Sequence, residues 1–183
     1  MPALTRTRTR AMSSLLALLA WAAANPAAAQ EAGYRGIKED LPIEAAPQPV
    51  PFSHKLHMAA GTACKDCHES AAVKERAGLP AAEKCMLCHQ AIATERPGIV
   101  KLAEMHKQGR SPEWVRVYKV PDFVFFNHSS HVKAGVECQS CHGPVETREV
   151  LAKEVSTSMT TCMDCHAGRK VSNECHMCHD LGQ

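Results

Sequence analysis

Five copies of the pattern C-x-x-C-H contain every cysteine of this 183-residue chain. The copies begin at Cys64, Cys85, Cys138, Cys162 and Cys175. For a chain with 10 cysteines and 11 histidines, random placement would give on the order of 0.03 such copies. The fold must therefore accommodate five pairs of cysteines, each followed directly by a histidine.

This spacing has a chemical explanation. Two thiols three positions apart can each form a thioether with one vinyl group of a single haem, and the next histidine is then held against the iron as its proximal ligand. We therefore predict five covalently bound c-type haems. The predicted attachment residues are Cys64, Cys67, Cys85, Cys88, Cys138, Cys141, Cys162, Cys165, Cys175 and Cys178. The predicted proximal iron ligands are His68, His89, His142, His166 and His179.

Paired cysteines have two other common uses. They form disulfide bonds in exported proteins and half-sites for structural zinc. Neither use requires a histidine after every second cysteine, and zinc sites would combine the pairs two by two, which leaves one of the five over. Haem attachment is therefore the favoured interpretation, with disulfides and zinc as the alternatives.

The composition agrees with an interior made largely of haem. Only 4% of the residues are aromatic, which is few for an ordinary hydrophobic core. We predict a mainly α-helical and irregular fold, dominated by haem and with little regular secondary structure. Haems packed into so short a chain would lie close together, as electron transfer along a series of haems requires.

Six histidines lie outside the five proximal positions. His176 sits between the two cysteines of its own motif and is expected on the surface. The other five equal the number of vacant axial positions, which predicts that every iron is six-coordinate with two histidines. The predicted distal ligands are His54, His57, His106, His128 and His131. Met58, Met105 and Met159 are alternative ligands, although methionine more often fills gaps in a core.

Local signals predict a few secondary-structure elements. Pro97 at a first turn and Gly109 as a stop predict a helix that carries His106 on one face. Short helices are also expected within residues 69–78 and 82–96, and residues 114–120 are β-prone.

The chain contains an internal repeat. The segment FSHKLHMAAGTACKDCH at residues 52–68 aligns without a gap, at an offset of 74, with FNHSSHVKAGVECQSCH at residues 126–142. The Phe, both His, Ala-Gly and the C-x-x-C-H all coincide. We predict a pentahaem domain over residues 52–183, with two H-x-x-H units of two haems each at about 52–110 and 111–170 and a terminal haem at 171–183.

The N-terminus has the pattern of a secretory signal peptide. Arg6, Arg8 and Arg10 precede an apolar run, and Ala27 to Ala29 fit a cleavage site before Gln30. Residues 1–29 are therefore predicted to be a cleavable Sec-type signal, followed by an extended proline-rich lead-in at 30–51. This predicts a periplasmic protein, which a partner could hold at the outer face of the inner membrane. Without the three arginines, 18 basic residues face 19 acidic ones, and no basic patch indicates nucleic acid.

The order Phe, H-x-x-H and C-x-x-C-H resembles the class III cytochromes c, which are small exported multihaem electron carriers. In that family the first His of H-x-x-H ligates the haem attached just downstream, and the second reaches another haem. The resemblance implies that His54 pairs with His68 and that His128 pairs with His142. His57 and His131 would each serve another haem, which the sequence does not identify.

A second resemblance covers residues 114–166. The stretch WVRVYKVPDFVFFNHSSHVKAGVECQSCHGPVE, followed by Ser158-Met159 and a further motif, is similar to the pentahaem subunits of alternative complex III, a quinol-oxidising respiratory complex. Those subunits are longer and typically membrane-anchored. This chain is shorter and has a predicted cleavable signal, which implies a soluble or peripheral relative of these subunits whose partner the resemblance does not identify.

These observations predict an electron carrier and not an enzyme. Its redox partners would be a membrane quinol-oxidising or dehydrogenase complex and a downstream reductase or cytochrome, which would dock through a basic surface because haem propionates add negative charge. One alternative is a fixed electron-transfer subunit of a membrane respiratory complex. Another is a small reductase with one open haem, where His106 marks the least constrained position.

Overall fold

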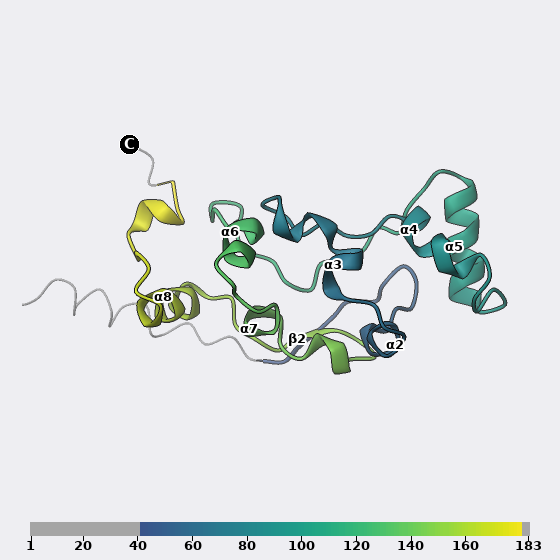
Figure 1. The fold of residues 1–183 in the computed structure, drawn as a ribbon, viewed down its shortest axis with the longest axis horizontal. Helices are drawn as coiled ribbons and strands as arrows, with labels where there is room; N and C mark the ends of the chain where they lie inside the picture. The colour runs from purple at the N-terminus through teal and green to yellow at the C-terminus, as the bar shows by residue number, and fades with distance from the viewer. Residues whose placement is uncertain (1–40, 181–183) are drawn as a thin grey trace, which may run out of the picture. The chain divides into compact units, whose positions relative to one another are not determined.

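The computed structural model describes residues 41–180, and the predicted signal peptide and residues 30–40 of the lead-in lie outside this range. Figure 1 shows the course of the chain. The elements are β1 (Ile43–Glu44), α2 (His54–Ala59), α3 (Cys64–Cys67), η1 (Glu69–Ala72), α4 (Ala82–His89), α5 (Pro97–Lys107), α6 (His128–Lys133), α7 (Gln139–His142), η2 (Val145–Thr147), β2 (Ala152–Lys153), α8 (Met159–Gly168) and η3 (Cys175–Met177), where η marks a 3-10 helix.

Regular structure is short and sparse. The longest described helices, α5 and α8, have 11 and 10 residues. The strands β1 and β2 have two residues each and pair antiparallel, with Ile43 opposite Lys153. This confirms the predicted fold class of short helices joined by irregular segments. No described helix is both long and apolar enough to span a bilayer.

The described residues have almost no hydrophobic core. Their buried aliphatic side chains are Val50, Ala82 and Leu102, whereas large apolar side chains such as Val73 and Leu87 are mostly exposed. Three buried side chains cannot offset the conformational entropy that is lost when so long a backbone is ordered. The polypeptide therefore needs an internal filling that its own side chains do not provide.

The helix predicted around His106 is present. α5 begins at Pro97, which needs no helical hydrogen-bond partner for its nitrogen, and the chain leaves the helix through Gly109 with a φ of 66°. α5 packs against α4. The helices expected within residues 69–78 and 82–96 form only over the shorter spans of η1 and α4.

The sequence repeat is also a repeat of local structure. α2 and α6 each have six residues and begin after a side-chain cap: Ser53 accepts from the N–H of Leu56, and Asn127 accepts from the N–H of Ser130. Each helix is followed by a glycine with positive φ, 90° at Gly61 and 70° at Gly135. The same capping chemistry therefore sets the start of both helices.

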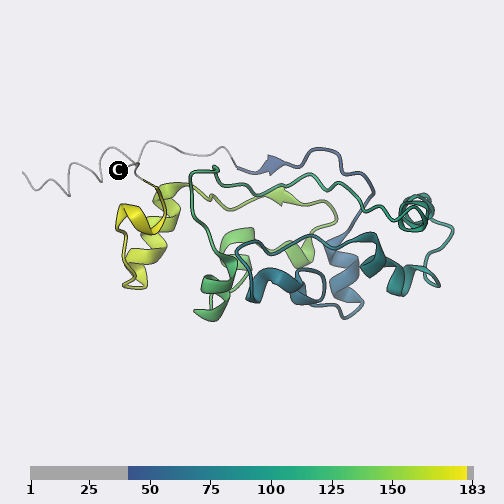
Figure 2. The same cartoon turned by 90° about the horizontal axis from the view of Figure 1, so that it is seen from above.

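The β-prone residues 114–120 do not form a strand, because this segment has no strand partner among the described residues. The backbone N–H and C=O of Val115 instead bond to the side-chain amide of Gln48, both at 3.0 Å. A side chain from the lead-in thus satisfies the backbone groups that a neighbouring strand would otherwise satisfy. Figure 2, viewed from above, shows residues 41–51 of the lead-in running beside the rest of the described chain.

Candidate haem centres

Most of the histidines donate one ring N–H to a backbone carbonyl. The contacts from Nδ1 to oxygen are His57 to Ser53 (2.7 Å), His68 to Gly78 (2.8 Å), His89 to Ile92 (2.9 Å), His128 to Glu75 (2.7 Å), His131 to Asn127 (2.8 Å), His166 to Ser172 (3.1 Å) and His179 to Phe123 (3.3 Å). A carbonyl oxygen can only accept, so Nδ1 carries the hydrogen and Nε2 keeps its lone pair. This is the arrangement of histidines that bind a metal through Nε2.

Three of the proximal candidates each face a second imidazole at nearly the same separation. The ring centroids are 6.1 Å apart for His57 and His89, 6.4 Å for His128 and His142, and 6.2 Å for His131 and His166. Metal–nitrogen bonds of about 2.0 Å, with about 1.1 Å from nitrogen to ring centroid, put two rings on opposite sides of one ion about 6.2 Å apart. The spacing of all three pairs fits two axial ligands of one iron.

His54 lies beside the remaining histidine of the first motif. Burial lowers the pKa of His54, and the charges of His68 and then His57 lower it further. A lowered pKa keeps the imidazole neutral, which is the form that binds a metal. The influence of its charge places His68 near His54, so the two histidines of α2 lie near two different motifs.

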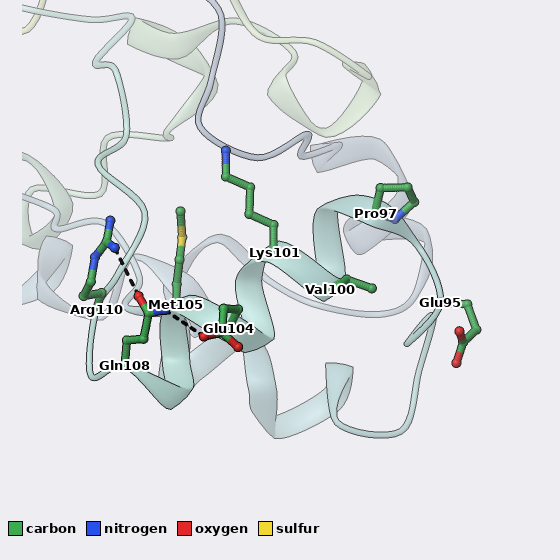
Figure 3. Close-up of a pocket in the computed structure, with 8 residues that line it drawn as sticks. All are labelled: Glu95, Pro97, Val100, Lys101, Glu104, Met105, Gln108 and Arg110. Atoms are coloured by element: carbon green, nitrogen blue, oxygen red, sulfur yellow. Dashed lines mark hydrogen bonds between the residues drawn. The ribbon is translucent and has the colours of Figure 1, made fainter.

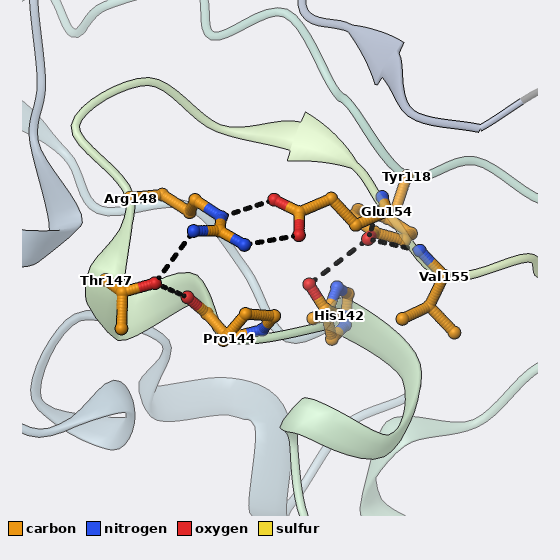
Figure 4. A network of polar contacts seen from close by, with 7 residues as sticks. All are labelled: Tyr118, His142, Pro144, Thr147, Arg148, Glu154 and Val155. Atoms are coloured by element: carbon orange, nitrogen blue, oxygen red, sulfur yellow. Dashed lines mark hydrogen bonds and ion pairs between the residues drawn. The ribbon is translucent and has the colours of Figure 1, made fainter.

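His142 is held by a network around Tyr118 (Figure 4). The Tyr118 hydroxyl donates to the carbonyl of His142 at 3.1 Å and accepts the backbone N–H groups of Glu154 and Val155, and its ring lies edge-on to the His142 ring at 4.6 Å. Burial, followed by the charges of His128 and His68, lowers the pKa of His142 to about 4. His142 is thus neutral and fixed in position.

The cysteines of different motifs also lie close together. Burial raises the pKa of the Cys64 thiol, and the charge of Cys138 and a hydrogen bond with it raise it further. Burial and then the charge of Cys67 raise the pKa of the Cys85 thiol. The first motif in the chain therefore neighbours both the third motif and the second.

The remaining motifs continue this series. Burial and then the charge of Cys165 raise the pKa of the Cys141 thiol. The pKa of Cys162 is raised first by burial and then by Cys141, Cys178 and Cys165. The third motif thus neighbours the fourth, and the fourth neighbours the fifth. The spatial order of the five motifs is second, first, third, fourth and fifth.

The structure does not bring His106 to another histidine. His106 is exposed on α5 and makes no ring contact with any residue of the described range. Its neighbour Met105 lines a hollow of about 550 Å³ with Lys101 and Glu104, and His106 is not part of that lining (Figure 3). The predicted role of His106 as a distal ligand gains no support from this position.

The state of the cysteines and a buried polar group at Trp114 both fit a haem-filled interior. None of the ten cysteines is in a disulfide, and within residues 41–180 no group of three or more His, Cys, Asp or Glu side chains is placed to hold a metal ion by itself. The indole N–H of Trp114 is buried without a hydrogen-bond partner, next to Phe52 and its stacked His57. A buried donor of this kind needs an acceptor, which a haem propionate would supply.

Comparison with known proteins agrees with this chemistry. Residues 30–116 match the model of the class III cytochrome c family, and residues 124–180 match that of cytochrome c7 and related cytochromes c. The chain is also 30% identical over 160 residues to the "Menaquinone reductase, multiheme cytochrome c subunit" of Nitratidesulfovibrio vulgaris, an alignment that covers 72% of this chain and 76% of that protein. The chain belongs to the class III family of multihaem cytochromes c. As a member of that family, the cytochrome binds c-type haem covalently and takes part in electron transport.

The sequence did not identify the partners of His57 and His131, the second histidines of the two H-x-x-H segments. In the cytochrome His57 faces His89 and His131 faces His166. The separations along the chain, 32 and 35 residues, are similar in the two copies of the repeat. That similarity was the available signal. The carbonyl partners of the histidines and the Tyr118 network have no comparable sequence signature, because they depend on backbone positions far along the chain.

Proposed function

We propose that this cytochrome carries five haems and transfers electrons between a quinone oxidoreductase complex and a second redox protein. The attachment residues are the ten cysteines of the five motifs, and the proximal ligands are His68, His89, His142, His166 and His179. The distal ligands of the first four haems are His54, His57, His128 and His131, respectively on the irons of His68, His89, His142 and His166. The observation that carries this proposal is the common separation of three histidine pairs, 6.1 to 6.4 Å between ring centroids.

The paired imidazoles determine what chemistry the sites can support. A bound haem iron supplies a one-electron Fe(II)/Fe(III) couple. Two histidine nitrogens on one iron leave no position for a substrate, so these sites favour electron transfer over bond chemistry. The hydrogen bonds from Nδ1 to a carbonyl, which six of the eight paired histidines make, hold the ring direction and increase the electron donation of Nε2. Both effects favour the ferric state and hence a comparatively low potential.

The order of the motifs supports a continuous path. Neighbouring thiols join the second motif to the first, the first to the third, and then the third to the fourth and fifth. Electrons that enter beside α4 would therefore leave beside the C-terminal motif, or the reverse. The path differs from the chain order because the first and third motifs belong to the two copies of the repeat, which lie against each other.

The partner is inferred from the relative. The similar protein of Nitratidesulfovibrio vulgaris is named as a subunit of menaquinone reductase, so we infer that this cytochrome is a subunit or close partner of a membrane quinone oxidoreductase. This requires export, and we propose a periplasmic position at the outer face of the inner membrane after removal of residues 1–29. The second partner would be a reductase or cytochrome with a basic docking surface.

The experiment is purification of the cytochrome from its native membranes under mild detergent. Five covalent haems per chain are expected by mass spectrometry, together with co-purifying subunits of a quinone oxidoreductase. A water-soluble menaquinone analogue in its quinol form should reduce the haems in the complex and not in the isolated cytochrome. Fewer haems, or equal reduction rates with and without the other subunits, would contradict the proposal.

A further inference from the structure

The histidine of the fifth motif has no imidazole partner. All 11 histidines of the chain lie within the described residues; six of them form the three pairs of neighbouring rings given above, and His54 lies near His68. His106, His176 and His179 remain. If the fifth iron had a distal histidine from this chain, it would have to be His106 or His176.

Neither of these two histidines is placed for that role. His106 is on α5, which packs against α4 at the second motif, and both views show α5 and the yellow C-terminal segment at opposite ends of the described chain (Figures 1 and 2). His176 is exposed inside η3, between the two cysteines that attach the same haem. A haem held by Cys175, Cys178 and His179 would have this loop on its proximal side, where His176 is poorly placed to become the opposite ligand.

The groups that do surround His179 offer no ligand atom. The ring in contact with it belongs to Phe123, 5.8 Å away between centroids, and its Nδ1 donates to the Phe123 carbonyl. Val124 forms an isolated β-bridge with His179, and Phe125 donates its N–H to the carbonyl of Cys178 at 2.8 Å. The Phe123 ring contacts the proximal histidine, and the backbone of Val124 and Phe125 holds the segment around it. The side chains of all three residues are hydrocarbon and cannot bind iron.

We propose that no side chain of residues 41–180 fills the position opposite His179, so that the haem attached at Cys175 and Cys178 keeps one exchangeable axial position. This inference rests on the proposed function, since it requires covalent haem at the fifth motif. The ligands such a position takes are small: water in the ferric state, and uncharged π-acceptors such as carbon monoxide in the ferrous state. The C-terminal haem would then be high-spin beside four low-spin haems.

The test uses the mature, fully haem-loaded chain. Titration of the dithionite-reduced protein with carbon monoxide should give about one adduct per five haems, and EPR of the oxidised protein should show one high-spin ferric signal. His106→Ala and His176→Ala should leave both results unchanged. His131→Ala, which removes a proposed ligand from the iron of His166, should raise carbon monoxide binding to about two per five haems and serves as the positive control.

Two results would overturn the inference. One is an oxidised protein with only low-spin haems and no carbon monoxide adduct, which would mean that a histidine or a methionine completes the fifth site. The other is a rise in carbon monoxide binding in His106→Ala. Either result leaves five covalent haems and electron transfer intact, whereas a haem count below five by mass spectrometry would contradict the proposed function itself.

Discussion

At the scale of single residues, six of the eight paired histidines donate Nδ1–H to a backbone carbonyl. At His128 the Nδ1–H donates to the carbonyl of Glu75 at 2.7 Å, and the ring lies 6.4 Å from the His142 ring between centroids. The acceptor is a backbone atom, so no substitution of Glu75 would remove it. The direction of the imidazole is therefore set by the course of the backbone, and neighbouring side chains act mainly by holding that backbone in place.

Tyr118 is such a side chain. Tyr118→Phe keeps the ring contact with His142 but leaves the carbonyl of His142 and the N–H groups of Glu154 and Val155 without their partner. Because partly buried backbone groups lose hydrogen bonds, we expect the free energy of unfolding to fall by about 1–3 kcal/mol with haem content unchanged. Guanidinium chloride unfolding of the haem-loaded protein measures this.

A matched control for this variant is Thr147→Val, in the same network. The Thr147 hydroxyl donates to the Pro144 carbonyl at 2.8 Å, and both it and the Arg148 nitrogen that bonds to it are exposed. Loss of these exposed contacts should change stability by no more than about 0.5 kcal/mol. Equal losses in the two variants would show that the Tyr118 hydroxyl does not hold the His142 segment.

At the scale of elements, a six-residue helix is the unit that joins two haem sites. α2 begins with His54 and α6 begins with His128, and each carries a second histidine three residues later. The second histidine also donates its Nδ1–H to the carbonyl of the cap residue, from His57 to Ser53 and from His131 to Asn127. A change in the cap would therefore alter the helix start and a ligand direction together.

Asn127→Ala tests the cap of α6. The amide oxygen of Asn127 accepts from the N–H of Ser130 at 3.2 Å and from the hydroxyl of buried Ser129 at 2.8 Å. Removal of both bonds should lower the free energy of unfolding by about 0.5–2 kcal/mol and broaden the low-spin EPR signals of the haems served by this helix. Asn127→Ser restores the cap that α2 uses, so it should recover most of the loss; if it does not, the cap is not the cause.

Gly135 tests the exit from the same helix. Its φ is 70° and the space where a Cβ would lie is empty, so Gly135→Ala causes backbone strain without a clash. The expected loss of unfolding free energy is about 1–2 kcal/mol. Gly168, within α8, also faces open space but has no positive φ. Gly168→Ala should therefore be neutral or stabilising by up to about 1 kcal/mol, and thermal unfolding of both variants would reveal whether the signs differ.

The sequence predicts local elements of this cytochrome better than it predicts contacts between distant segments. The α5 helix is predictable because Pro97 and Gly109 act within a few residues of its ends. No strand forms at the β-prone residues 114–120. The backbone of Val115 bonds to the side chain of Gln48, which comes from a segment far away in the sequence. Equal numbers of histidines and vacant iron positions also predict a role for His106, which stays a prediction because a count contains no distances.

At the scale of the whole molecule, haem takes the place of a hydrophobic core. The described chain buries Val50, Ala82 and Leu102, and several of the contacts that join its distant parts run between haem-binding segments. The two copies of the repeat are adjacent through Cys64 and Cys138, so the central pair of haems would be shared by both halves of the cytochrome. The same arrangement that orders the redox centres would therefore also stabilise the fold.

This arrangement predicts that the chain cannot fold without its haems. Production of residues 30–183 in a compartment that lacks haem attachment should give a polypeptide whose circular dichroism changes gradually on heating, with no cooperative transition. The physical reason is that the few buried side chains cannot offset the chain entropy. The haem-loaded protein should unfold cooperatively over the same range. Thiols must be kept reduced in the haem-free sample, because disulfides between its ten cysteines could order the chain by another route. A sigmoidal transition in the haem-free chain would show that the polypeptide has a core of its own.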